Sequence, residues 1–225
     1  MSEALPTVAI IGATGALGSA LARRLARAGR SVMLGSRDAT KSRAAAQTLA
    51  EQVGHPIGSG SNVDAAAAAD VVIVTVPFAA QRATLAEIAP AVRGKIVVDT
   101  TVPLVPPKVM RVQLPAEDSA AVIAQSVLGS DVKVVSAFHN VAAHKLATDQ
   151  DVDCDVLVFG DDKAAREVVV ALVAECGLRG LHAGALVNST AAEALTSVLI
   201  FLNKTYAVDG AGVRITGTLV KPSPG

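Results

Sequence analysis

The sequence predicts an α/β protein with a doubly wound parallel sheet and a smaller C-terminal part. Short aliphatic runs alternate along its 225 residues with segments of helical periodicity. Hydrophobic residues make up 51% of the chain, but aromatic residues only 2%. Small aliphatic side chains in continuous runs are typical of parallel strands that helices cover on both faces. Because right-handed crossovers bring the strand ends to one edge, we expect ligands to bind at that edge.

The chain begins with a predicted strand over residues 8–11, a glycine-rich turn and a helix with leucines on one face. The glycines of the turn are Gly12, Gly15 and Gly18. This order is the first unit of a Rossmann-type fold, in which the turn holds the pyrophosphate of a dinucleotide. A glycine-rich turn alone is also compatible with a tight bend that binds no ligand, so the end of the second strand matters more.

The second predicted strand ends in Gly35-Ser36-Arg37, and Lys41 follows one helical turn later. An NAD site usually has Asp or Glu here, which binds the ribose 2′-hydroxyl. Ser36, Arg37 and Lys41 would instead bind the 2′-phosphate of NADP, which a carboxylate would repel. The sequence therefore predicts NADP rather than NAD, although an isolated arginine is most often a surface charge.

Further strands and helices are predicted in alternation after this unit. The strands are predicted over residues 71–76, 95–99, 132–138 and 156–159, with a short one near 181–182. The helices between them are predicted over residues 40–53, 81–92, 119–128 and 164–176. We divide the chain into an NADP-binding domain, residues 1–150, and a smaller C-terminal part, residues 151–225.

The last predicted helix starts at Thr190-Ala191-Ala192-Glu193, which has the form of a capping box. It continues through Leu202 and is apolar on more than one face. About half of the apolar surface of this helix would be buried in the core of the protein. The remaining apolar surface predicts a contact between subunits, so we expect a homodimer.

Three of the predicted strands end in residues that could serve a ligand site. Val76 and Pro77 close the third strand and would lie beside the cofactor, although a proline also ends a strand without any ligand. Asp99 could be an acid–base group or a residue that fixes a loop. His139 is the histidine whose position suits catalysis, but it could equally be structural.

The sequence offers no obvious lysine or tyrosine dyad that would protonate a carbonyl oxygen. Reduction of a ketone or an imine usually requires such a general acid. Hydride transfer between two bound ring cofactors mainly requires that the rings are well oriented. The sequence therefore favours a pocket lined by small aliphatic side chains and backbone amides.

The charge balance and the lack of targeting signals argue against a nucleic-acid-binding, membrane-bound or secreted protein. The chain carries 20 basic and 20 acidic residues, which predicts no binding to nucleic acid or to a membrane surface. The N-terminus has no cationic segment before its first apolar run, and no uncharged apolar run reaches the ~18 residues of a membrane span. Cys154 and Cys176 indicate neither a disulfide framework nor a zinc site. We expect buried, reduced thiols in a cytoplasmic protein without a metal.

Several motifs together resemble one known family. They are GATGALG, GSR with Lys41, VTVPF, VVDTTVPLVPPK, SAFHNVAA, FGDDKAA and NKTYAVDGAGVRITG. From about Val8 to Gly217 the chain resembles the NADPH-dependent coenzyme F420 reductases, also called F420:NADP oxidoreductases. The resemblance implies an enzyme that transfers a hydride between NADP(H) and the deazaflavin coenzyme F420, usually as a homodimer.

The resemblance also implies roles for particular residues. The turn that holds the pyrophosphate is matched by Thr14, Gly15, Ala16 and Leu17. The 2′-phosphate site is matched by Ser36, Arg37 and Lys41. The segment beside the nicotinamide and deazaflavin rings is matched by His139, Val141 and Ala143. In this family the branched aliphatic residue at Val141 sets the spacing of the rings, and the C-terminal part completes the deazaflavin pocket and the dimer contact.

Two alternatives stay open. The first is an NADP-dependent reductase of a small imine or carbonyl substrate. Such enzymes usually carry a large helical domain after the dinucleotide domain, and only residues 151–225 are available for it here. The second is a non-catalytic NADP-binding protein, which would bind NADPH tightly and contact a partner through Val198–Leu202.

Overall fold

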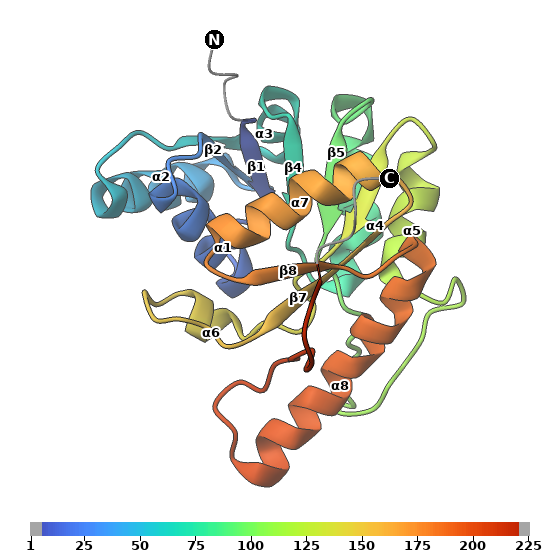
Figure 1. The fold of residues 1–225 in the computed structure, drawn as a ribbon. Coiled ribbons are helices and arrows are strands. Elements are labelled where there is room, and N and C mark those ends of the chain that lie inside the picture. The colour runs from blue at the N-terminus through green and yellow to red at the C-terminus, as the bar shows by residue number, and fades with distance from the viewer. Residues whose placement is uncertain (1–5, 221–225) are drawn as a thin grey trace.

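A computed structural model describes residues 6–220 of the chain. Within this range eight strands form one sheet in the order β3-β2-β1-β4-β5-β6-β7-β8, with helices on both faces (Figure 1). The strands are β1 (Val8–Ile11), β2 (Val32–Ser36), β3 (Gly58–Ser61), β4 (Val71–Val74), β5 (Ile96–Asp99), β6 (Lys133–Ser136), β7 (Asp155–Gly160) and β8 (Arg179–His182). Neighbouring strands are parallel except β6 and β7, which are antiparallel. The predicted α/β fold is confirmed.

Helices cover both faces of this sheet, and the last helix projects beyond it (Figure 1). They are α1 (Ala16–Arg27), α2 (Ala39–Val53), α3 (Asn62–Ala68), α4 (Phe78–Ile88), α5 (Ala120–Leu128), α6 (Ala143–Leu146), α7 (Lys163–Glu175) and α8 (Ser189–Tyr206), with short 3₁₀ turns at Ala89–Ala91 and Leu186–Asn188. Successive residues of a strand face opposite sides of the sheet. In β1, Val8 and Ile10 pack in the core that includes α1, α2 and α7, whereas Ala9 and Ile11 pack in the core that includes α3, α4 and α5. Continuous aliphatic runs are therefore required in the central strands.

The ends of the central strands lie at one edge of the sheet. Strands β1, β4, β5 and β6 end at Ile11, Val74, Asp99 and Ser136. These last residues lie in register, because each is paired with the last residue of the neighbouring strand. Two of these strands are shorter than predicted, because β4 ends at Val74 and β6 ends at Ser136. Phe138, at the predicted end of β6, has a φ of 66°, which is incompatible with an extended strand.

The edge strand β3 was not predicted. Its four residues, Gly58–Ser61, carry no aliphatic run and are only half-buried. A β-carbon on Gly58 would lie 1.9 Å from the sulfur of Met33 on the paired strand β2, so a larger residue here would require the Met33 side chain to move.

The predicted capping box at the start of the last helix is wrong. Helix α8 starts one residue earlier, at Ser189, and Asn188 before it makes no side-chain cap. The Thr190 hydroxyl donates to the carbonyl oxygen of Val187 instead. The Glu193 side chain is buried against α5, where its carboxylate accepts hydrogen bonds from the backbone N–H groups of Ala120 and Ala121. The Glu193 carboxylate therefore binds the start of another helix, α5, instead of capping the start of its own.

The C-terminal part continues the same sheet, because Val135 and Ser136 of β6 pair with Gly160 and Phe159 of β7. Helix α8 projects away from the sheet (Figure 1). The division at residue 150 stays a prediction. Cys154 and Cys176 are buried and free, as predicted.

One segment of the described chain, Leu186–Tyr206, is long and apolar enough to cross a membrane by length and composition alone. A third of its most apolar window is buried in the structure, and core helices of soluble proteins satisfy the same criterion.

Candidate active site

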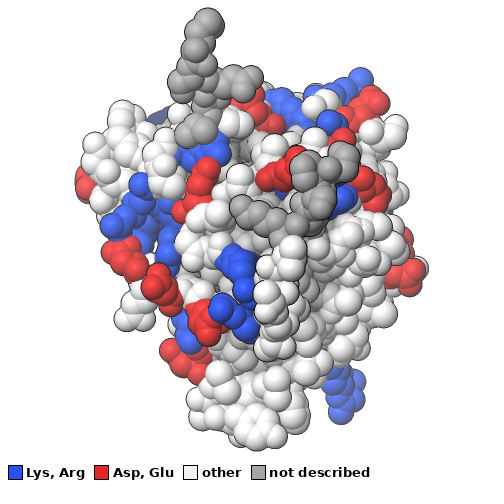
Figure 2. All heavy atoms as spheres, viewed as in Figure 1, with Lys and Arg blue, Asp and Glu red and all other residues white. Residues whose placement is uncertain are grey.

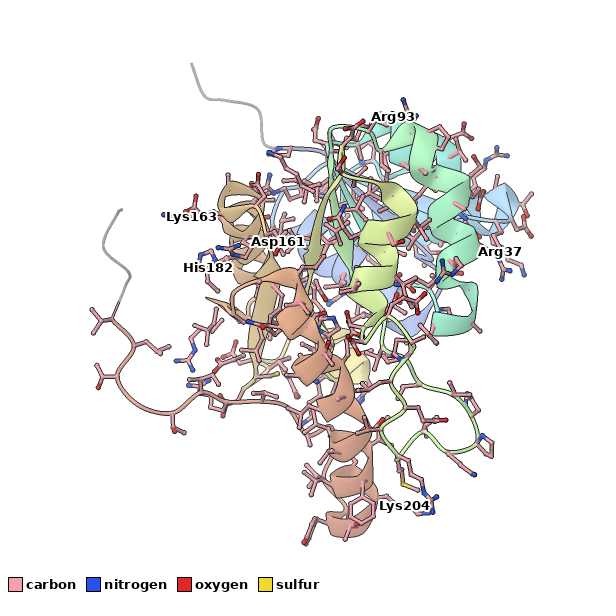
Figure 3. The ribbon with its side chains drawn as sticks, turned by 90° about the vertical axis from the view of Figure 1, so that its right-hand side faces the viewer. Arg37, Arg93, Asp161, Lys163, His182 and Lys204 are labelled. Atoms are coloured by element: carbon pink, nitrogen blue, oxygen red, sulfur yellow. The ribbon has the colours of Figure 1, made fainter. Side chains whose placement is uncertain are left out.

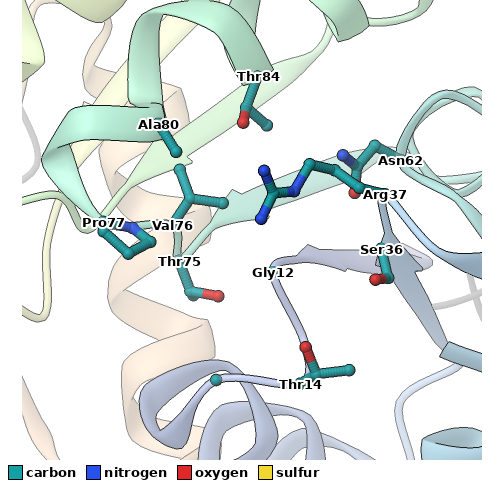
Figure 4. A pocket seen from close by; sticks show the side chains of 11 residues that line it. Gly12, Thr14, Ser36, Arg37, Asn62, Thr75, Val76, Pro77, Ala80 and Thr84 are labelled. Atoms are coloured by element: carbon teal, nitrogen blue, oxygen red, sulfur yellow. The ribbon is translucent and has the colours of Figure 1, made fainter. Parts of the chain in front are cut away.

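A pocket lies at the C-terminal ends of β1, β2 and β4, between the glycine turn and the start of α4 (Figure 4). Strand order reverses here, since β1 lies between β2 and β4, and ligands of open α/β sheets bind at such a point. The lining residues are Gly12, Thr14, Gly15, Ser36, Arg37, Asn62, Thr75, Val76, Pro77, Ala80 and Thr84.

The glycine turn brings the backbone close to β4. Gly12 has a φ of 82°, a left-handed conformation that favours glycine, and a β-carbon there would lie 3.0 Å from Val76. A β-carbon on Gly18 would lie 2.5 Å from the Thr75 hydroxyl oxygen, so α1 packs against the end of β4 only with glycine at this position. Gly15 is the N-cap of α1 and offers no side chain to the first-turn amides. These amides are the usual site for a phosphate at a helix N-terminus.

The end of β2 forms the other wall of the pocket. The Ser36 hydroxyl oxygen accepts a hydrogen bond of 3.2 Å from the backbone N–H of Asp38, which leaves the hydroxyl hydrogen for a ligand. Arg37 extends across the pocket, with its guanidinium group toward Val76 (Figure 4). Lys41 lies exposed in the first turn of α2 and is not part of the wall.

One acidic residue, Asp38, lies between these basic groups. Its carboxylate caps α2, accepting hydrogen bonds from the backbone N–H of Thr40 at 3.0 Å and from the Thr40 hydroxyl at 2.5 Å. These bonds lower the pKa of the Asp38 carboxyl, the hydroxyl bond most. The carboxylate therefore serves its own helix rather than a ribose.

His139 follows β6 at the same edge of the sheet. Its side chain is buried, with Nε2 at 2.7 Å from the Ser136 hydroxyl oxygen and its ring centroid 6.4 Å from that of Phe159. Burial lowers the pKa of His139 to about 4, so the imidazole is neutral near pH 7. The Thr196 hydroxyl of α8 donates to the His139 carbonyl oxygen at 3.0 Å, which fixes the loop.

Several predicted site residues line the pocket together, namely Gly12, Thr14, Gly15, Ser36, Arg37, Val76 and Pro77. The others lie outside its wall. They are Ala16, Leu17 and Gly18 in α1, Lys41 in α2, and His139, Val141 and Ala143 after β6. Among the other histidines, His182 lies on the opposite side of the molecule from Arg37 (Figure 3).

Of the other four lining residues, Thr75 lies within the predicted VTVPF motif, whereas Asn62, Ala80 and Thr84 were not predicted. Ala80 and Thr84 face the pocket one turn apart on α4, which no local motif marks. Asn62 begins α3, and a capping box between Ser61 and Asp64 fixes this start. That Ser-x-x-Asp pattern is the signal that could have placed Asn62 at a helix start beside the ligand edge.

Asp99, the other candidate, belongs to a buried network. Its carboxylate accepts hydrogen bonds from Gln81 Nε2 at 2.6 Å and from the Thr101 hydroxyl at 2.7 Å. Burial, together with the charge of Glu193, raises the pKa of Asp99 to about 7 against the effect of the Thr101 and Gln81 hydrogen bonds. Asp99 is not part of the pocket wall, and its bonds are those of a residue that fixes a loop.

The fold and the pocket define a dinucleotide-binding protein. Residues 7–103 match the family described as NADP oxidoreductase, coenzyme F420-dependent. An F420-dependent NADP reductase of Methanothermobacter thermautotrophicus is 41% identical over 218 residues, covering 93% of this chain and 94% of the relative. One of Methanocaldococcus jannaschii is 39% identical over 220 residues, covering 93% and 97%. A crystal structure from Arthrobacter sp. FB24 superposes with a TM-score of 0.80 at 26% identity and covers 94% of this chain and all of that one. This chain belongs to the family of coenzyme F420-dependent NADP oxidoreductases, as its motifs predicted.

Proposed function

We propose that NADP(H) binds in the pocket at the ends of β1, β2 and β4, and that F420 meets it on the His139 side of the same edge. Membership of the family makes this chain an F420-dependent NADP reductase, whose cofactors are NADP(H) and coenzyme F420. When both are bound, their rings supply the redox chemistry, the direct transfer of a hydride. The chain supplies binding, orientation and exclusion of water.

The observation that carries the assignment is the pairing of two phosphate sites in one pocket. The first-turn amides of α1 would hold the pyrophosphate. Ser36 and Arg37 would hold the 2′-phosphate, with Lys41 adding charge nearby. The carboxylate of Asp38, next to Arg37 in the chain, accepts hydrogen bonds from Thr40, so it caps α2 rather than binding a ribose 2′-hydroxyl.

The part of the site near His139, where we propose that the nicotinamide and deazaflavin rings meet, needs no proton donor. A hydride passes between two ring carbons, so orientation supplies most of the rate enhancement. A neutral, buried His139 suits a residue that shapes this wall. We assign Val141 and Ala143 to the same wall because they are half-buried and follow His139 along the edge.

The two alternatives predict other features. A reductase of a small imine or carbonyl would need a general acid at the ring end, but His139 is neutral near pH 7 and Asp99 lies outside the pocket wall. A non-catalytic NADP-binding protein would differ from its relatives, which are reductases.

The homodimer is part of this proposal. On α8, Val198 and Phe201 are 42% and 49% exposed and lie one turn apart. The neighbouring loop, tied to α8 by the bond from the Ser197 hydroxyl to the Arg111 carbonyl oxygen, exposes Val112. Figure 2 shows a largely uncharged surface over α8. Residues 151–225 would then supply the dimer contact and part of the deazaflavin pocket.

Light scattering on a sizing column tests the dimer. We expect twice the chain mass for the parent and half of that for Phe201→Glu, whereas Lys163→Glu on α7 leaves the mass unchanged. A monomeric parent would overturn the dimer. We also propose a cytoplasmic location, supported by the buried free thiols Cys154 and Cys176.

Calorimetric titration tests the binding assignment itself. NADPH should bind at least about tenfold more tightly than NADH, since charge-assisted hydrogen bonds to the 2′-phosphate are lost with NADH. Equal affinities would overturn the assignment of Ser36 and Arg37.

A further inference from the structure

Asn62 presents a polar edge inside the pocket. It is the first residue of α3, is only 2% exposed, and lines the pocket beside Arg37 (Figure 4). Its Nδ2 donates a hydrogen bond of 3.1 Å to the carboxylate of Glu87 on α4. Because a carboxylate only accepts hydrogen bonds, this contact determines which side of the amide is nitrogen. The carbonyl oxygen, Oδ1, is therefore the atom left for other partners.

That oxygen has no hydrogen-bond partner among residues 6–220, although it is buried. A buried acceptor without a donor costs free energy, and most buried polar atoms in proteins are paired. In a residue that lines a ligand pocket, an unpaired acceptor indicates that a ligand donor completes it.

The place of Asn62 along the pocket selects the donor. A β-carbon on Gly35 would lie 3.4 Å from the Asn62 Cα, so Asn62 lies against the end of β2 next to Ser36. If the 2′-phosphate lies at Ser36 and Arg37, the base on that same ribose lies beside them. Thr84 and Ala80 of α4 form the opposite wall. Adenine presents an exocyclic amino group, a hydrogen-bond donor that asparagine side chains recognise.

We infer that Asn62 selects the adenine base of NADP(H), its Oδ1 accepting a hydrogen bond from the 6-amino group. This inference rests on the proposed binding of NADP(H) in the pocket. The amide is held ready by two contacts, the capping box of Ser61 and Asp64 at the start of α3 and the bond to Glu87. An acceptor held in place loses little entropy on binding, which sharpens discrimination between bases.

The test compares NADPH with its hypoxanthine analogue, in which a carbonyl oxygen replaces the 6-amino group. Binding to the unaltered protein is measured by calorimetry without F420. We expect the analogue to bind at least about tenfold more weakly, because two acceptors then face each other. Equal affinity for the two dinucleotides would overturn the inference and assign Oδ1 to a buried water.

Variants separate this role from a structural one. Asn62→Ala should weaken NADPH binding and bring the two affinities to within about twofold, since no amide remains to distinguish the bases. Glu87→Gln, which keeps an acceptor for Nδ2, should retain the discrimination. Retained discrimination in Asn62→Ala would contradict the assignment.

The comparison with NADH separates the assignment of the NADP(H) pocket from the role of Asn62 within it. A preference for NADPH over NADH without a preference for adenine means that the pocket is assigned correctly and Asn62 is not. Failure to bind NADPH at all overturns both.

Discussion

The carboxylate of Glu193 caps a helix that begins 73 residues earlier in the chain, at Ala120. Its Oε2 accepts a hydrogen bond of 2.6 Å from the Ala120 N–H, and its Oε1 one of 3.1 Å from the Ala121 N–H. These bonds join α8 to α5. Helix α8 in turn holds the loop at His139 through Thr196 and through Ala192, whose carbonyl oxygen accepts from Asn140 Nδ2 at 2.9 Å. The cap therefore positions one wall of the proposed ring site.

Replacing Glu193 with Ala should lower the free energy of unfolding by about 2–4 kcal/mol, because two buried N–H groups lose their acceptor. Urea denaturation measures this loss. Thr190→Ala is the matched control on the same helix, expected within about 0.5 kcal/mol of the parent, because Thr190 only donates to the Val187 carbonyl oxygen. Equal losses in the two variants would contradict the cap.

Replacing Arg37 with Ala should weaken NADPH binding by ~10- to 100-fold, because charge-assisted bonds to the 2′-phosphate disappear. NADH binding should change little. Titration of both dinucleotides gives the two ratios, and Arg43→Ala, an exposed arginine of α2 outside the pocket wall, controls for lost charge. An equal loss for NADH and NADPH would exclude Arg37 from the phosphate site.

The stability contributed by Asp99 should depend on pH. Its pKa is raised to about 7 in the fold, so between the unfolded value near 4 and pH 7 the native state holds a proton that the unfolded state has lost. This contribution is complete at low pH and falls as the pH rises to about 7, by up to ~1.4 kcal/mol per pH unit.

Unfolding in urea at pH 5, 6, 7 and 8 measures this effect. The difference in stability between the parent and Asp99→Asn should shift against the parent up to pH 7 and then level off. Asp131→Asn, at an exposed site, is the control for the removal of one carboxylate. A pH-independent difference for Asp99→Asn would show that the carboxyl is ionised throughout.

Replacing His139 with Asn should lower turnover by less than about tenfold, because a neutral imidazole that shapes the ring site transfers no proton. The dependence of turnover on pH should keep the parent's form between pH 6 and 8, since burial holds the pKa of His139 near 4. A loss of about 10²- to 10⁴-fold with a new pH dependence would instead identify a general acid.

Local patterns predicted the central part of this fold well. The runs that form β1 and β4 are buried on both faces, so burial itself requires continuous aliphatic residues. The edge strand β3 is paired on one side and half-buried, and its Gly-Ser sequence carries no such requirement. Nothing in the sequence alone marks it as a strand.

The site divides in the same way. Gly12 lines the pocket because of its backbone conformation in the turn, and Arg37 because its charge lies at the end of a strand. Both features can be predicted from a short sequence motif. Asn62 and Thr84 reach the pocket because α3 and α4 pack against each other, and this depends on contacts distant in sequence. Glu193 shows the limit most directly, since a perfect local capping pattern is overridden by burial against α5.

The measurement that tests the central claim most directly is the absorbance of oxidised F420 after mixing with this protein and NADPH, with NADH as the control. We predict rapid loss of the F420 absorbance with NADPH and little loss with NADH. If the absorbance persists while NADPH binding is detectable, the pocket binds the dinucleotide but direct hydride transfer to F420 is contradicted.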